Sequence, residues 1–106
     1  MGDYTMFGPN VTIATAGHPI LPELREKAYQ YNAPVHIGKN CWIGAGAIIL
    51  PGITIGDNVV VGAGSVVTKN LPSGVVAVGN PCSILRKVNE RDREYYFKNK
   101  KMPQDL

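Results

Sequence analysis

Aliphatic residues recur at every sixth position through the middle of the chain. The first set is Ile37, Ile43, Ile49, Ile55, Val61 and Val67. A second set, two positions earlier, is small or aliphatic: Val35, Cys41, Ala47, Ile53, Val59 and Ser65. Because side chains alternate along a strand, both sets point to one side and the residue between them points to the other. A period of six fits no α-helix, which repeats every 3.6 residues or so. The pattern therefore predicts short strands joined by corners.

Glycine follows four of the six repeating aliphatic residues, at positions 38, 44, 56 and 62. Glycine suits a corner because its backbone conformation is unrestricted. Three six-residue units would close a triangular coil of 18 residues, and stacked coils make a parallel β-helix. The same frame returns early in the chain, at Phe7 and Ile13. An antiparallel β-sandwich with glycine-rich turns is the alternative, but its strands usually recur at about 8–12 residues.

The residues that point out of the predicted coils are mostly apolar. They are His36, Trp42, Ile48, Thr54, Val60 and Val66. Positions 18 apart would stack, and this would leave two of the three faces apolar. A monomer rarely exposes that much apolar surface. We therefore expect neighbouring subunits to cover two faces in a homotrimer, a closed three-fold ring. The alternative is that the C-terminal segment covers one face.

A long segment, residues 14–34, departs from the repeat. Loops of this length in a compact fold are usually functional or disordered. The segment contains His18, one of two histidines, together with Tyr29 and Tyr31. We expect this loop to leave a corner of the β-helix and to reach over a neighbouring subunit.

The repeat ends at residues 79–81, and the pattern then becomes charged. Residues 84–100 predict an α-helix, with Leu85 and Val88 on its apolar side and a solvated charged face. We therefore expect an all-β domain over residues 1–80, with the loop 14–34 inserted, and a helical extension over residues 81–106.

Charge and composition exclude several classes of protein. The chain has 106 residues and a net charge of +3. Residues 1–83 hold four basic and four acidic residues, and residues 84–106 hold seven and four. This local excess is too small to indicate a nucleic-acid surface. No apolar run approaches the roughly 18 residues of a membrane span, and no signal peptide is visible. Two cysteines fit a reducing cytoplasm, where we expect the protein. No histidine or cysteine cluster has metal-site spacing.

Several motifs, taken in order, resemble one family of enzymes. Residues 17–19 read GHP, residues 37–44 read IGKNCWIG, residues 51–58 read PGITIGDN and residues 89–98 read NERDREYYFK. The set is similar to the galactoside and maltose O-acetyltransferases, and residues 89–98 look like the galactoside branch. The resemblance is to the C-terminal part of these hexapeptide-repeat acyltransferases. It implies a left-handed β-helix, a hand that the period alone does not give.

The resemblance implies acetyl-CoA-dependent transfer of an acetyl group to a sugar hydroxyl, with acetyl-CoA as co-substrate and no metal. A thioester is already activated, so the reaction needs a general base whose pKa lies near the working pH, as histidine has. His18 matches the family's catalytic histidine. Trp42 matches a residue that walls the site, and Tyr29 and Tyr31 are candidates for binding the sugar. For His18, the alternative is a loop histidine that hydrogen-bonds across a subunit boundary.

The resemblance also implies a set of cofactor-binding positions. They are Ala45, Ala63, Thr68, Lys69 and Arg86. The guanidinium of Arg86 suits a phosphate near the nucleotide end. Ala45 stands where the galactoside branch has serine, so a backbone N–H would have to stabilise the oxyanion. Ser83 stands in place of a second family arginine, which predicts weaker coenzyme A binding.

Two other functions stay open from the sequence. The first is the same chemistry on a different acceptor, because related β-helix enzymes acetylate antibiotics, serine or amino sugars. The second is a catalytically impaired β-helix trimer that only binds coenzyme A or assembles. Ser83 favours the second function, and so does the lack of a match to the family's N-terminal part, which supplies part of the sugar pocket.

Overall fold

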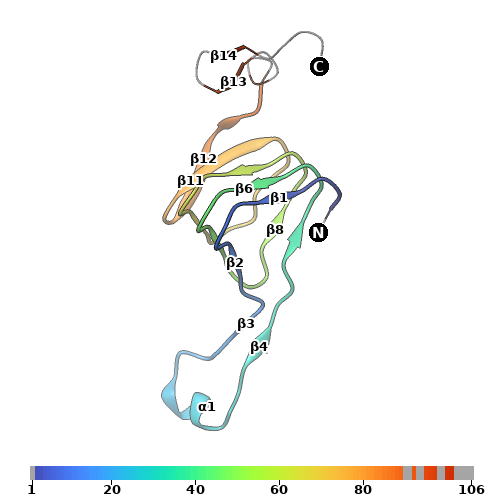
Figure 1. Cartoon of the computed structure of the whole chain (residues 1–106). Helices are drawn as coiled ribbons and strands as arrows, with labels where there is room; N and C mark the ends of the chain where they lie inside the picture. The colour runs from blue at the N-terminus through green and yellow to red at the C-terminus, as the bar shows by residue number, and fades with distance from the viewer. Residues whose placement is uncertain (1, 90–91, 93–94, 98–99, 102–106) are drawn as a thin grey trace.

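Short parallel strands stack on the three faces of a triangular prism (Figure 1). The structure is a computed structural model that describes residues 2–89, 92, 95–97 and 100–101. The Trp42 face holds β1 (Met6–Phe7), β6 (Trp42–Ile43), β9 (Val60–Val61) and β11 (Val75–Gly79). The Ile48 face holds β2 (Thr12–Ile13), β7 (Ile48–Ile49) and β10 (Val66–Val67). The His36 face holds β5 (His36–Ile37) and β8 (Thr54–Ile55).

The strand register confirms the predicted coil of 18 residues. Trp42 pairs with Val60, Ile48 with Val66 and His36 with Thr54, all in parallel. Each face therefore repeats one position of the sequence pattern in successive coils. The result is a parallel β-helix, as the period of six predicts.

The strand residues alternate between core and surface as the pattern predicts. From β5 to β10, the second residue of each strand is at most 6% exposed. The first residue is half-buried or exposed. The buried side chains form one cluster that runs through the prism. Ser65 is the one buried polar residue among those that the structure describes, and its Oγ accepts a hydrogen bond from the Gly79 N–H at 3.0 Å.

The corners repeat one backbone conformation from coil to coil. Asn10, Gly46 and Gly64 have φ of 60°, 70° and 69°. This is the left-handed region that glycine and asparagine tolerate. Gly44 is under a different constraint, because a Cβ there would lie 2.6 Å from the backbone nitrogen of Ala63 in the next coil. Glycine at this corner therefore lets successive coils approach within hydrogen-bonding distance.

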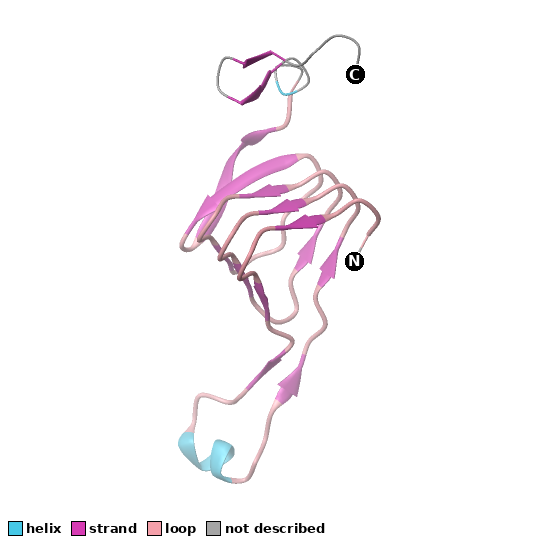
Figure 2. Ribbon diagram, viewed as in Figure 1, coloured by secondary structure: helices cyan, strands magenta, loops and turns pink. Residues whose placement is uncertain are grey.

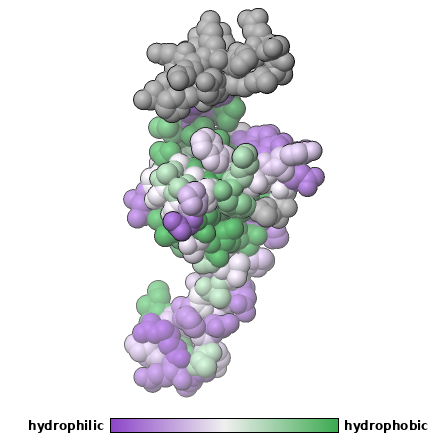
Figure 3. Space-filling view, viewed as in Figure 1, coloured by the Kyte–Doolittle hydropathy of each residue, from purple (hydrophilic) through white to green (hydrophobic). Residues whose placement is uncertain are grey.

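Residues 14–34 leave the prism as an arm (Figure 1). In it β3 (Ala16–Gly17) pairs antiparallel with β4 (Tyr31–Asn32), and α1 (Pro22–Glu26) lies near the tip. The arm lengthens its coil to 36 residues, because Met6 pairs directly with Trp42. Hydrophilic side chains cover much of the arm, whereas hydrophobic ones gather on the prism (Figure 3). No residue of α1 is buried.

The helix predicted over residues 84–100 is wrong for residues 84–87, 95–97 and 100, which lie in strands, whereas Asp92 is helical. β12 (Cys82–Lys87) pairs antiparallel with β11, and β13 (Tyr95–Phe97) pairs with β14 (Lys100–Lys101) (Figure 2). The chain reverses after Gly79, and β11 then offers an open sheet edge to the following residues. Pairing with that edge outweighs local helical preference. Residues 90–91, 93–94 and 98–99 of the predicted helix lie outside the described residues, and the domain boundary at residue 80 stays a prediction.

Candidate active site

His18 lies in the arm, immediately after β3, and its side chain is exposed. Its Nδ1 is 3.2 Å from the backbone carbonyl oxygen of Tyr29. A carbonyl oxygen can only accept a hydrogen bond, so in the neutral imidazole this contact requires the proton on Nδ1. The lone pair of Nε2 is then available to accept a proton. The arm thus presents a histidine in the tautomer that a general base needs.

The arm is held together by contacts between its own residues. β3 and β4 form two residue pairs, Ala16 with Asn32 and Gly17 with Tyr31. Beyond His18, Nη1 of Arg25 donates to the carbonyl oxygen of Ile20 at 2.8 Å. These contacts tie the two sides of the arm together on either side of the histidine.

The three aromatic candidates for substrate binding lie on two separate parts of the chain. Tyr29 and Tyr31 are in the arm, with 56% and 52% of their side chains exposed. Trp42 is on the prism, where it points out of β6 and is 59% exposed. One chain therefore carries His18 and Trp42 on different structural units. Both are open to a partner or a ligand.

Four of the five predicted cofactor residues border the Ile48 face. Ala45 and Ala63 follow β6 and β9 at one corner, where the Gly64 N–H donates to the Ala45 carbonyl oxygen at 2.8 Å. Thr68 and Lys69 follow β10 at the next corner. All four are exposed. The structure therefore places these residues, widely spaced in sequence, along the two edges of one face.

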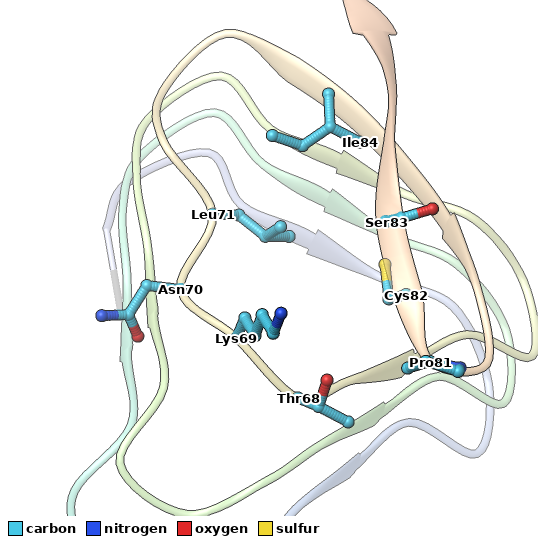
Figure 4. A pocket seen from close by; sticks show the side chains of 8 residues that line it. All are labelled: Thr68, Lys69, Asn70, Leu71, Pro81, Cys82, Ser83 and Ile84. Atoms are coloured by element: carbon cyan, nitrogen blue, oxygen red, sulfur yellow. The ribbon is translucent and has the colours of Figure 1, made fainter.

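A groove of about 320 Å³ lies between the corner after β10 and the start of β12 (Figure 4). Its lining residues are Thr68, Lys69, Asn70, Leu71, Pro81, Cys82, Ser83 and Ile84. The Lys69 side chain extends from the corner toward β12. Two predicted cofactor residues, Thr68 and Lys69, therefore line the same groove as Ser83, the position where the family has an arginine. No sequence pattern pointed to the other lining residues, because they meet only where β12 turns back.

Cys82 lines the groove but is a poor nucleophile. Its side chain is only 8% exposed. Burial raises the pKa of its thiol above the ordinary value. The thiol therefore stays protonated near neutral pH, and only a thiolate is strongly nucleophilic. Cys82 is therefore a structural residue in the wall of the groove.

Arg86, the fifth predicted cofactor residue, does not line the groove. Its Nη1 and Nη2 donate to Oδ2 and Oδ1 of Asp92 at 2.9 and 2.7 Å. These hydrogen bonds raise the pKa of the guanidinium, which stays charged. Asp92 Oδ2 also accepts the Asn89 N–H at 2.8 Å. A phosphate that binds Arg86 would therefore meet a side chain already paired with a carboxylate.

The residues that the structure describes contain no candidate metal site and no candidate membrane span. No group of three or more histidine, cysteine, aspartate or glutamate residues in that part of the chain could hold a metal ion. Within the same residues, no helix is long and apolar enough to cross a membrane.

The fold and the sequence together define a class of protein, the hexapeptide-repeat β-helices. Residues 34–69 match the family described as "Hexapeptide repeat of succinyl-transferase". The chain superposes on a galactoside acetyltransferase in complex with coenzyme A, with a TM-score of 0.93 and 50% sequence identity; the match covers 96% of this chain and 51% of that one. This likeness supports the left-handed β-helix that the motifs imply.

The relatives that resemble this chain in sequence point to a narrower group within this class. The chain is 53% identical over 105 residues to the galactoside O-acetyltransferase of Lactococcus lactis. This match covers 99% of this chain and 51% of that relative. It is also 51% identical over 102 residues to the galactoside O-acetyltransferase of Escherichia coli. This match covers 96% of this chain and 50% of that relative. The resemblance to the galactoside O-acetyltransferase family is confirmed, and the chain spans about half the length of these curated relatives.

Proposed function

We propose that this chain takes part in acetyl transfer from acetyl-CoA to a sugar hydroxyl, galactoside-like, with His18 as general base. One observation carries the proposal: the Tyr29 carbonyl holds Nδ1 of an exposed histidine and leaves Nε2 free to accept a proton. The similarity to galactoside O-acetyltransferases supports the class of reaction. A hydroxyl that meets Nε2 would lose its proton as its oxygen attacks.

The reaction needs one base and no covalent enzyme intermediate. The hydroxyl oxygen forms a bond to the acetyl carbonyl carbon while Nε2 of His18 takes the proton. The tetrahedral intermediate then collapses, the carbon–sulfur bond breaks, and the imidazolium returns a proton to the leaving thiolate. A backbone N–H at the Ala45 corner is the proposed donor to the oxyanion, because Ala45 has no hydroxyl.

Acetyl-CoA is the proposed co-substrate, and the residues of the prism suit its parts. Ala45 and Ala63 are small and exposed, so they leave room for a long chain along the edge of the Ile48 face. Lys69 in the groove supplies a cation for phosphate. The solved relative that holds coenzyme A supports this assignment.

The separation of His18 from Trp42 supports a site shared between subunits. Each arm would reach over a neighbouring prism, and apolar residues on two faces would pack between prisms in a homotrimer. Trp42 would then wall a site to which the neighbour's His18 belongs.

The test is acetylation itself. Acetyl-CoA is mixed with the full chain and a panel of galactosides and other sugars, and acetylated product is detected by mass. We expect product from the parent and a loss of about 100-fold or more in His18→Ala, the usual contribution of a general base. His36→Ala is the matched control, because His36 is the other histidine and lies exposed on a prism face. Equal activity in His18→Ala and the parent would rule out His18 as the base.

The alternative function is a catalytically impaired β-helix trimer that only binds coenzyme A or assembles. Ser83 in the groove and the Arg86–Asp92 ion pair favour it, because both leave fewer cations to hold the phosphates of acetyl-CoA for the reaction. Folded parent protein that binds coenzyme A, yet acetylates no acceptor in the panel, would establish this alternative in place of the proposed function.

A further inference from the structure

The aromatic ring of Tyr31 lies directly against Gly17, the residue that precedes His18. The two residues are register partners in the pairing of β3 with β4. A Cβ added at Gly17 would collide with Cζ and Oη of Tyr31. Glycine is therefore required at this position for the ring to occupy its place.

This contact is not part of a hydrophobic core. Tyr31 is 52% exposed, and the arm has no buried side chain of its own. β3 and β4 contribute only two residue pairs, with one further hydrogen bond from the Ala33 N–H to the Thr15 carbonyl oxygen at 2.7 Å. Two-stranded pairings of this size are marginal in water. The ring on Gly17 therefore makes a large contribution to the contact between the two sides of the arm.

The hydrogen bond of His18 spans the same two sides. Nδ1 belongs to the side that follows β3, and the Tyr29 carbonyl belongs to the side that precedes β4. The 3.2 Å between these atoms depends on how closely the two sides approach. Gly17 adjoins His18, and Tyr31 is two residues from Tyr29. The Gly17–Tyr31 contact is thus well placed to set this separation.

We propose that Gly17 and Tyr31 form a positioning pair that keeps the proton of neutral His18 on Nδ1. The proposal rests on the proposed function for its catalytic meaning, since it is the base that is being positioned. Tyr31 then acts through His18, in contrast to the sugar-binding role expected from the sequence. Without the ring, the Nδ1 hydrogen bond weakens and the tautomer with the proton on Nε2 becomes populated. That tautomer cannot accept the hydroxyl proton at Nε2, the nitrogen that faces away from the Tyr29 carbonyl.

The test reads the tautomer directly. Imidazole ¹⁵N shifts are recorded on the full chain above pH 8, where His36, the other of the two histidines, serves as internal reference. We expect the parent to show His18 with a protonated Nδ1. Gly17→Ala, which displaces the ring, and Tyr31→Ala, which removes it, should both shift His18 toward protonated Nε2. Tyr31→Phe keeps the ring and should retain the parent spectrum.

The double variant and a matched control sharpen the result. Gly17→Ala with Tyr31→Ala should shift His18 no further than Tyr31→Ala alone, because both changes remove one contact. Ile20→Ala is the control, since Ile20 is 91% exposed, lies two residues from His18 and keeps its carbonyl. An unchanged His18 tautomer in both single variants would overturn the proposal, as would an equal shift in Ile20→Ala. Signals of the buried prism residues report that each variant is folded.

Kinetics separate this proposal from the proposed function. Gly17→Ala and Tyr31→Ala should lower kcat by about tenfold or more and leave KM for acetyl-CoA unchanged, because a misplacement of about 1 Å can cost on the order of 100-fold in rate. The tautomer measurement needs no turnover. If His18→Ala were fully active, the proposed function would fail while the positioning result stood. A normal kcat in variants with a shifted tautomer would overturn the catalytic meaning of the pair.

Discussion

The ion pair between Arg86 and Asp92 affects how this chain can meet a phosphate. The guanidinium uses both of its terminal nitrogens on the carboxylate. The two side chains are 45% and 35% exposed, so solvent screens the pair. Exposed ion pairs contribute little to stability. Asp92 is thus a weak competitor that a nucleotide phosphate can displace.

Replacing Asp92 should therefore strengthen binding of coenzyme A. Asp92→Asn keeps an oxygen that can accept the Asn89 N–H and removes the charge that competes for Arg86. We expect the Kd for coenzyme A, measured by titration calorimetry, to fall by up to about fivefold, because an exposed pair is a weak competitor.

Pantetheine, which has no nucleotide phosphates, is the matched ligand for this titration. Its Kd should be the same for Asp92→Asn and the parent. Arg86→Gln should weaken coenzyme A binding on its own and abolish the gain from Asp92→Asn. Tighter coenzyme A binding that persists in the Arg86→Gln background would contradict the idea that Asp92 competes for this arginine.

The sequence singled out candidate site residues but not their hydrogen-bond partners. His18 was identified by its motif, but its bond to the Tyr29 carbonyl depends on how the arm folds, which no residue type reveals. Arg86 was identified by resemblance, but Asp92 was not expected as its partner. Residues six apart lie on different sides of the helix predicted there, and they meet only because the segment is not a regular helix.

At the scale of the structural elements, the corner after β6 combines two kinds of glycine. Gly46 needs its left-handed φ of 70° but has open space around its Cα, with nothing within 4 Å of an added Cβ. Gly44 has the opposite constraint, because the backbone of the next coil occupies the place of a Cβ. Glycine is thus needed at position 46 for its left-handed backbone conformation and at position 44 because the next coil lies so close.

These two glycines should respond differently to substitution. Gly44→Ala forces a Cβ against the backbone nitrogen of Ala63 and should lower the free energy of unfolding by about 1–3 kcal/mol, as overpacking does. Gly46→Asn should change it by no more than about 0.5 kcal/mol, because Asn10 has a φ of 60° at the equivalent corner.

Urea unfolding at a fixed chain concentration gives both values, since the midpoint of an oligomer depends on concentration. The informative result is which of the two variants loses more free energy of unfolding. If Gly46→Asn proved the more damaging change, backbone conformation rather than coil-to-coil distance would limit the corner.

Elements with a strict repeat could be predicted from the sequence, and elements without one could not. The predicted inward residues from Ile37 to Val67 are all buried, because each coil packs on the next in the same register. The segment after residue 81 has no repeat, so its charge pattern predicted a helix. This segment forms β12 instead, because β11 lies beside it and pairs with it. Local residue preferences carry no information about such a partner.

At the scale of the whole molecule, the three prism faces differ in polarity. The Trp42 face presents Met6, Trp42 and Val60, with Met6 and Trp42 69% and 59% exposed. The His36 face presents His36 and Thr54. A single chain therefore leaves large apolar side chains in water on one face and polar ones on another. This asymmetry supports assembly through the apolar face.

A charge on the Trp42 face should therefore break the assembly. Trp42→Glu replaces an exposed side chain, so the single chain should fold normally, but a glutamate buried between prisms would lack a partner. We expect sedimentation to give the parent a mass of about three times 11.4 kDa and Trp42→Glu a mass near 11.4 kDa at the same concentration.

His36→Glu is the matched control, because it puts the same charge on the first residue of a strand on the polar face. It should keep the mass of the parent. A parent that sediments as a single chain would contradict the trimer, and a trimer that persists in Trp42→Glu would exclude this face from its interface.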